Sequence, residues 1–120
     1  LAYYNRDPAA LETTQLLEAT YRKFPLVPFH PGTHFQCNFG HLNGYSAIYY
    51  TYMWSLVIAK DLFSKFQEGK TILDPTVARR YRETILAPGS RKPAAELIED
   101  FLGRPLSFDA FENWLDREGR

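Results

Sequence analysis

The 120-residue sequence has very little cysteine and no net charge. Its single cysteine, Cys37, excludes an intrachain disulfide framework and indicates a reducing compartment. The 14 basic and 14 acidic side chains cancel, and no basic tail or stripe stands out. Binding to nucleic acid or to an anionic membrane surface depends on such basic charge. We therefore predict a cytoplasmic protein with no nucleic-acid partner and no membrane partner.

The sequence also lacks a long apolar run and a signal peptide. Its longest apolar stretch, residues 45–59, is too short to span a bilayer and contains hydroxyl groups throughout. The chain starts at Leu1, and neither a charged segment nor an apolar segment of the signal-peptide type follows. We interpret the missing initiator methionine as a sign that this is a piece of a longer protein.

Apolar and aromatic side chains, in contrast, are plentiful. They make up 45% and 16% of the residues, against 23% that are charged, which is typical of a globular chain. A chain of this length forms one domain at most. Because no segment alternates with the period of a strand, we predict an all-α fold of about five helices, with residues 1–120 as a single fragment.

Cap, proline and glycine signals set the expected helix limits. Asp7 and Asp74 are each an N-cap residue followed by proline. Gly103 is suited to end a helix, and Ser107 to begin one. The expected helices cover residues 9–24, 46–66, 76–86, 94–102 and a last segment from Ser107 on. The organisation is thus a loop over 25–44, a site helix over 45–66 and C-terminal helices within 74–118.

Helical periodicity also predicts which side chains face inward. They are Leu11, Leu16, Leu17, Thr20 and Tyr21 in the first helix, Leu97, Ile98, Phe101 and Leu102 in the fourth, and Phe108, Phe111, Trp114 and Leu115 in the fifth. The helix over 46–66 is apolar on nearly every side, so we expect part of it to pack against protein that this chain lacks.

The segment 25–44 is rich in proline and glycine, and we predict a long ordered loop. A loop of this length is usually functional or crosses another domain. Phe29, Phe35 and Phe39 are expected to hold it in place. Its last five residues form a turn that begins and ends with glycine.

Six residues at this turn and just after it are candidate site residues: Gly40, His41, Gly44, Tyr45, Tyr49 and Tyr52. On a helix the three tyrosines lie at i, i+4 and i+7 and share one face, with the histidine just before it. The two glycines allow sharp bends. The group is either a site for a polar substrate or an aromatic core stripe with a capped loop. Tyrosine is unusual in pure packing, because each buried hydroxyl needs a partner.

Metal-ligand patterns are weak in this sequence. His30, His34 and His41 do not stand in H-E-x-x-H spacing, and Cys37 is one cysteine where structural zinc sites use several. No Ser-His-Asp arrangement, phosphate-binding loop or pair of catalytic carboxylates stands out. We predict no metal ligand and no zinc bound by this chain alone.

From about Pro28 onward the sequence closely resembles the thimet oligopeptidase-like zinc metallopeptidases. The resemblance rests on P-G-T-H-F and F-G-H-L-N-G-Y-S-A-I-Y-Y-T-Y-M-W. It continues through D-L-F at residue 61, Y-R-E-T-I-L-A-P-G at residue 81, F-L-G-R at residue 101 and D-A-F at residue 109. It covers most of the chain from about Pro28 and points to the C-terminal region of such an enzyme.

The resemblance implies a large helical enzyme that cuts short peptides with one zinc ion. The family's zinc ligands lie in a region that precedes the part seen here. By position, Tyr49 and Tyr52 match tyrosines that donate hydrogen bonds to the oxyanion, and His41 and Tyr45 match substrate contacts. Gly40 and Gly44 would let the loop close over a peptide.

Two classes of function follow. The leading hypothesis is a C-terminal fragment of a zinc oligopeptidase, inactive alone, with short peptides as substrates and the missing N-terminal part of the same protein as its partner. The alternative is a stand-alone helical module that binds peptides or proteins without cutting them. Self-association of the fragment through its apolar face is a further possibility.

Overall fold

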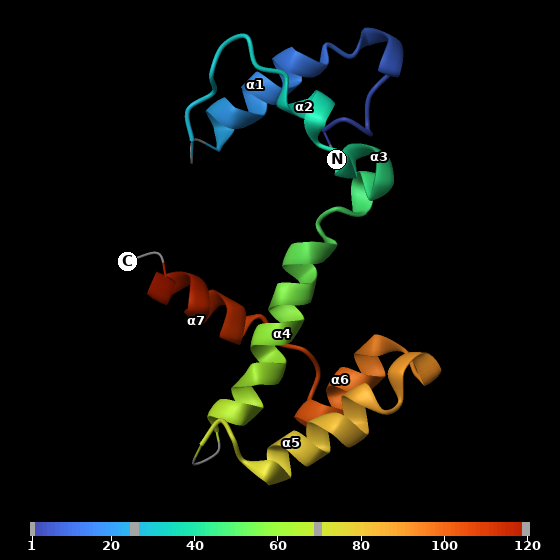
Figure 1. The fold of residues 1–120 in the computed structure, drawn as a ribbon, viewed down its shortest axis with the longest axis vertical. Helices are drawn as coiled ribbons and strands as arrows, with labels where there is room; N and C mark the ends of the chain where they lie inside the picture. The colour runs from blue at the N-terminus through green and yellow to red at the C-terminus, as the bar shows by residue number, and fades with distance from the viewer. Residues whose placement is uncertain (1, 25–26, 69–70, 119–120) are drawn as a thin grey trace. The chain divides into compact units, whose positions relative to one another are not determined.

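A computed structural model describes residues 2–24, 27–68 and 71–118 (Figure 1). These described residues form helices and connecting loops without a strand, which confirms the all-α prediction. The chain divides into two compact units, residues 1–51 and 52–120, which we describe one at a time. The expected single unit over 1–120 stays a prediction, and the expected start of the loop at positions 25–26 lies outside the described residues.

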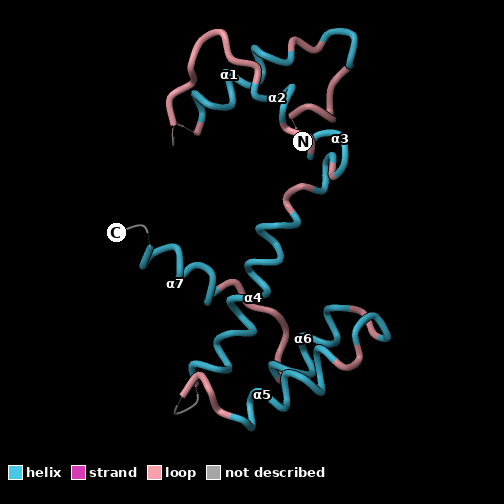
Figure 2. Tube along the Cα trace, in the orientation of Figure 1, coloured by secondary structure: helices cyan, strands magenta, loops and turns pink. Residues whose placement is uncertain are grey.

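The first unit consists of short helices joined by turns (Figure 2). They are η1 (Pro8–Ala10), α1 (Thr13–Lys23), α2 (Phe35–Asn38), α3 (His41–Gly44) and η2 (Ser46–Ile48). Asp7 caps the first turn as expected, because its carboxylate accepts a hydrogen bond from the Ala9 N–H at 3.0 Å. Leu11 and Glu12 are extended, so the helix expected over 9–24 is split into a 3-10 turn and α1.

The loop of the first unit is held against α1. The ring of Phe29 meets Tyr21 edge-on at 5.8 Å, and Gln36 donates to the Thr14 hydroxyl at 2.8 Å. Leu17 is buried, as expected. Thr20 is exposed, contrary to expectation, and its hydroxyl donates to the Leu16 carbonyl at 2.8 Å. That bond to the preceding turn satisfies the hydroxyl without burial.

The second unit contains the longer helices. They are α4 (Thr51–Gln67), α5 (Pro75–Tyr81), η3 (Arg82–Leu86), η4 (Gly89–Arg91), α6 (Ala94–Leu102) and α7 (Asp109–Glu118). Asp74 caps α5 by accepting from the Thr76 N–H at 2.8 Å. The helix expected over 76–86 changes after Tyr81 into the π-helical turn η3, where the Ala87 N–H donates to the Arg82 carbonyl at 2.8 Å.

The core of the second unit lies between α6 and α4. Ile98, Phe101 and Leu102 are buried in it, and Ile58, Leu62, Phe66, Val77, Tyr81, Ile85 and Leu106 pack around them. Figure 1 shows α5 beside α6, while α7 approaches α4 from another side. The bounds of α6, its inward residues and its end at Gly103, with φ +73°, all agree with the sequence prediction.

The apolar face of α7 is less covered than the sequence predicts. Phe108 and Leu115 are exposed, whereas Phe111 and Trp114 are half-buried. Single α4 side chains contact this face: Trp54 lies edge-on to Phe108, and the Lys60 ammonium stands 4.2 Å from the centre of the Trp114 ring. These contacts cover only part of the face. Within the described ranges, no helix is long and apolar enough to cross a membrane.

Candidate functional site

The turn that carries the candidate residues is helical in the structure. α3 spans His41–Gly44, and the Tyr45 N–H continues it by donating to the His41 carbonyl at 3.0 Å. The hydroxyl of Tyr4 donates to the Leu42 carbonyl and ties the start of the chain to this turn. The predicted loop therefore ends in a short, hydrogen-bonded helix.

The helix expected from residue 46 begins instead at Thr51. Between α3 and α4 the chain forms the 3-10 turn η2, and Ser46 has a left-handed φ of +52°. That conformation is uncommon for a residue other than glycine. It interrupts the helical repeat between Tyr45 and Tyr52, so the expectation that the three tyrosines share one face of a continuous helix is wrong.

The structure nevertheless brings three candidate residues of the first unit together. The His41 ring lies 5.2 Å from the Tyr45 ring and 5.1 Å from the Tyr49 ring, measured between ring centres. Phe39 packs against two of these rings. Its ring centre lies 5.5 Å from that of His41 and 5.0 Å from that of Tyr49. Phe35 stacks on Phe39 at 5.3 Å. Such aromatic pairs each stabilise by roughly 0.5–1.5 kcal/mol beyond simple burial.

The tyrosines are partly open to solvent. Tyr45, Tyr49 and Tyr52 expose 39%, 40% and 49% of their surface, and His41 is half-buried. The described residues of this chain therefore leave these rings partly uncovered. Tyr52 is the second residue of α4 and belongs to the second unit.

The two candidate glycines adopt ordinary backbone conformations. Gly40 has φ −55° and lies in the helical region, and neither Gly40 nor Gly44 has a positive φ. A Cβ atom added at either position would meet no heavy atom within 4 Å. The sharp bend of this segment therefore lies at Ser46 and not at the glycines. What the glycines provide is open space above the turn.

Zinc ligands are not assembled among the described residues. No three side chains of the His, Cys, Asp or Glu type come close enough there to hold a metal ion. His34 Nδ1 lies 3.1 Å from the Thr14 hydroxyl, and His30 Nδ1 lies 3.0 Å from the Pro31 carbonyl. Cys37 is exposed. The described part of the chain does not fit a zinc site.

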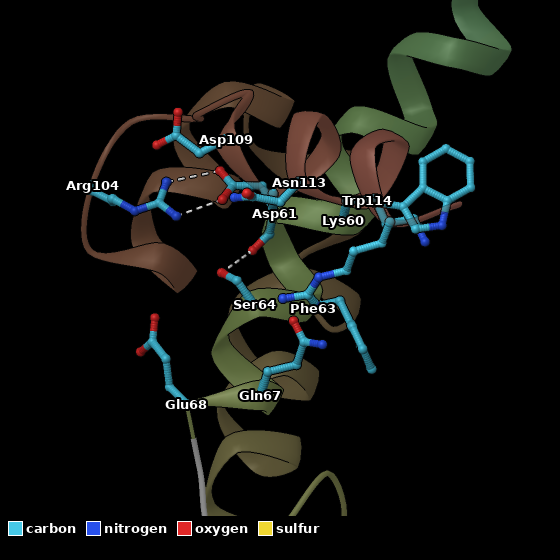
Figure 3. Close-up of a pocket in the computed structure, with 12 residues that line it drawn as sticks. Lys60, Asp61, Phe63, Ser64, Gln67, Glu68, Arg104, Asp109, Asn113 and Trp114 are labelled. Atoms are coloured by element: carbon cyan, nitrogen blue, oxygen red, sulfur yellow. Dashed lines mark hydrogen bonds and ion pairs between the residues drawn. The ribbon is translucent and has the colours of Figure 1, made fainter. Parts of the chain in front are cut away.

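The second unit contains an ionic cluster around a buried carboxylate, which the sequence analysis missed (Figure 3). Asp61 is 1% exposed and accepts two hydrogen bonds from Arg104, at 2.5 Å and 2.9 Å. The Ser107 N–H donates a third at 2.8 Å. The cluster borders a cavity of about 370 Å³ between α4 and α7. The available signal was one carboxylate within the apolar sequence of α4.

The partners of Asp61 keep it ionised. Burial alone would raise the pKa of this carboxyl, but the hydrogen bonds from Arg104 and Ser107 and the Arg104 charge lower it on balance. The hydrogen bonds to Asp61 and its negative charge raise the pKa of Arg104. Both carboxylate oxygens are occupied, so this group is suited to hold structure and not to transfer protons.

Comparison with known proteins identifies the family of this chain. Residues 2–117 match the family described as peptidase family M3. The chain belongs to peptidase family M3. This membership confirms the resemblance to thimet oligopeptidase-like peptidases that the sequence predicted.

Several relatives are identical to the chain at about a third of the aligned positions. It is 36% identical over 107 residues to a mitochondrial intermediate peptidase of Schizophyllum commune, covering 82% of this chain and 13% of that protein. It is 32% identical over 112 residues to the human mitochondrial intermediate peptidase, covering 91% and 15%. A thimet-like oligopeptidase of Dictyostelium discoideum is 33% identical over 112 residues, covering 92% and 16%. The chain thus spans less than a fifth of the length of these relatives.

Proposed function

We propose that this chain is the substrate-side part of a zinc-dependent oligopeptidase of family M3, which hydrolyses short peptides. The observation that carries the proposal is the family match over residues 2–117. Since the chain spans 13–16% of the length of these three relatives, we propose that it works with a longer N-terminal part of the same polypeptide. That part would supply the zinc ligands.

In this proposal the tyrosines are the catalytic residues. Tyr49 and Tyr52 donate hydrogen bonds to the negatively charged oxygen that forms when water adds to the scissile carbonyl. A phenol suits this role because it is a neutral hydrogen-bond donor near pH 7. The loss of one such donor typically lowers the rate on the order of 100-fold. The partial exposure of both rings supports access to a bound peptide.

The remaining candidates bind the substrate. His41 and Tyr45 contact the peptide, and their rings lie 5.2 Å apart in the aromatic cluster of the first unit. Gly40 and Gly44 leave the space above the turn unfilled, so a peptide backbone can approach closely. The proposal assigns no zinc ligand to this set and leaves the zinc ligands to the N-terminal part of the polypeptide.

The direct test is zinc content together with peptide cleavage. We expect the complete gene product to contain about one zinc ion per chain and to cleave quenched-fluorescent peptides. The 120-residue chain alone is expected to contain no stoichiometric zinc and to show no turnover. Zinc-dependent turnover by the 120-residue chain, or no cleavage by the complete protein, would overturn the proposal.

A second candidate is a non-catalytic module that binds peptides or proteins. The exposed apolar side chains around η2, including Ile48 and Tyr50, favour it as a binding surface. Peptide affinity of the monomeric 120-residue chain, without cleavage by the complete protein, would support this candidate. Sedimentation at several concentrations separates peptide binding from self-association through the same apolar residues.

Cytoplasmic localisation stays part of the proposal. The relatives include proteins named mitochondrial intermediate peptidase as well as a thimet-like oligopeptidase. Fractionation of cells that produce the complete protein, with cytoplasmic and organellar markers, tests it. Enrichment with an organelle would replace the cytoplasmic assignment.

A further inference from the structure

The Asp61 cluster connects three parts of the second unit. Asp61 stands on α4, whereas Arg104 and Ser107 belong to the connection between α6 and α7. Arg104 also donates to the Pro105 carbonyl at 2.9 Å, and the Ser107 hydroxyl accepts from the Asp109 N–H at 3.1 Å at the start of α7. One carboxylate therefore fixes the whole α6–α7 connection to α4.

This attachment fixes how α4 is turned about its own axis. A two-bond contact between a carboxylate and a guanidinium is directional. The third bond, from the Ser107 N–H, is accepted by Asp61 Oδ2, which also accepts one of the two bonds from Arg104. Val57, one turn earlier, is buried on the same face as Asp61. Rotation of α4 would break all three hydrogen bonds and expose this face.

Tyr52 lies on the opposite face of α4. It precedes Asp61 by nine positions. At about 100° per residue, nine positions turn a helix by about two and a half revolutions, so the two side chains point in opposite directions. The exposure agrees with this geometry, because Tyr52, Ala59 and Phe63 are exposed while Asp61 is buried. The rotation that buries the carboxylate therefore turns the phenol outward.

We propose that Asp61 and Arg104 are positioning residues, which hold the rotation of α4 that presents Tyr52 to the substrate. This inference rests on the proposed function of Tyr52. Both Asp61 oxygens already accept hydrogen bonds, so Asp61 acts through α4 and has no role in proton transfer. The helical backbone of residues 52–61 connects the two side chains rigidly, and all of it lies within the second unit.

The first arm of the test measures Tyr52 directly in the 120-residue chain. The tyrosine rings are labelled, and the NMR signals that are missing from the variant Y52F are assigned to Tyr52. We expect D61N to shift and broaden the Tyr52 ring signals and to speed amide exchange at Ser107. The matched control is D100N, which removes a carboxylate from an exposed ion pair with Lys92 in the same unit. It should leave both readouts unchanged.

A second variant keeps the test decisive if D61N does not fold. R104K keeps the positive charge and removes the two-bond geometry. We expect it to shift the Tyr52 signals in the same direction and to a smaller extent. Unchanged Tyr52 signals in a folded D61N or R104K chain would overturn the proposal.

The second arm is a double-mutant cycle on the complete protein. We expect D61N to lower kcat about tenfold with little change in KM, as for a misplaced catalytic group. In the Y52F background, D61N should lower kcat less than about threefold, because the Tyr52 hydroxyl that Asp61 positions is gone. In the Y49F background it should keep its full cost. Equal costs in all backgrounds would show a purely structural role and overturn the proposal.

The two arms also separate this inference from the proposed function. If the complete protein cleaves no peptide, the proposed function fails, and the NMR arm still decides whether Asp61 sets the orientation of Tyr52. If cleavage occurs and the cycle shows no coupling to Tyr52, the proposed function stands and the positioning role fails.

Discussion

The two units of this chain differ in how many side chains each one buries in a core of its own. The second unit buries Phe101, Leu102 and their neighbours on α6, together with the paired Asp61 on α4. In the described part of the first unit, Leu17 alone is buried. Three of the six candidate site residues lie in the first unit's turn, and Tyr45 and Tyr49 follow it in the same unit. The unit with the core is therefore not the one that carries most of the proposed chemistry.

This difference matches a common division of labour in enzymes. Binding and catalytic groups often lie on segments with few buried contacts, while a packed scaffold supplies the stability. The aromatic contacts of His41, Tyr45 and Tyr49 order the first unit locally, and its rings remain partly exposed. The following changes test the contrast, from the largest expected effect to the smallest.

Phe101→Ala should have the largest effect on stability. The ring is 1% exposed and central to the α6 core. Its loss is expected to destabilise the second unit by about 3–5 kcal/mol in urea unfolding followed by circular dichroism. Leu17→Ala is the matched change in the first unit and should leave that transition in place. Equal losses from both variants would contradict two separately stabilised units.

Arg104→Ala should destabilise the second unit less than the core change. It leaves Asp61 buried without its partner, and we expect a cost of about 2 kcal/mol. The value is below that of a fully buried pair because the Arg104 side chain is 39% exposed and water can reach the carboxylate. Urea unfolding measures it, with Lys92→Ala as the control for an exposed pair to Asp100 in the same unit. An equal cost for both variants would contradict a special role of the Asp61 pair.

Acid should weaken the second unit through Asp61. Its pKa is lower in the folded than in the unfolded chain. The stabilisation is therefore fully present above the ordinary carboxyl pKa of about 4 and is lost as pH falls through the lower, folded value. Urea midpoints between pH 6 and pH 2 should fall for the wild type. The change of the urea midpoint with pH should be smaller in D61N. An unchanged pH dependence would contradict the role given to Asp61.

Gly40→Ala should have the smallest effect on stability. Gly40 is helical, and an added Cβ would meet no neighbour within 4 Å. We expect a change within about 0.5 kcal/mol, because alanine is compatible with this backbone. Peptide affinity of the complete protein should fall if the space above the turn receives substrate. Unchanged KM would count against Gly40 as a binding residue.

The sequence predicts the regular parts of this fold best. In α6 the spacing of Leu97, Ile98, Phe101 and Leu102 marks one face, and Gly103 marks the end, since both signals are local. The break at Ser46 was not predicted, because a positive φ there has no glycine to announce it. A single long helix was therefore expected where η2 and α4 lie.

Non-local contacts explain what the sequence missed at the sites. The partners of Asp61 follow it by more than 40 positions, so no local spacing indicates the pair. The meeting of His41, Tyr45 and Tyr49 was expected, but the structure achieves it through α3 and η2 rather than through one helix face. Phe39, which supports His41 and Tyr49, had been expected only to hold the loop in place.

The roles of the tyrosines are tested most directly by kinetics of Tyr49→Phe in the complete protein. The change removes one hydroxyl and keeps the ring that packs on Phe39. The account predicts a loss in kcat on the order of 100-fold with KM little changed, whereas Tyr50→Phe, next in sequence and 67% exposed, keeps wild-type rates. Equal rates for Tyr49→Phe and Tyr50→Phe would contradict the central claim that this segment supplies transition-state donors.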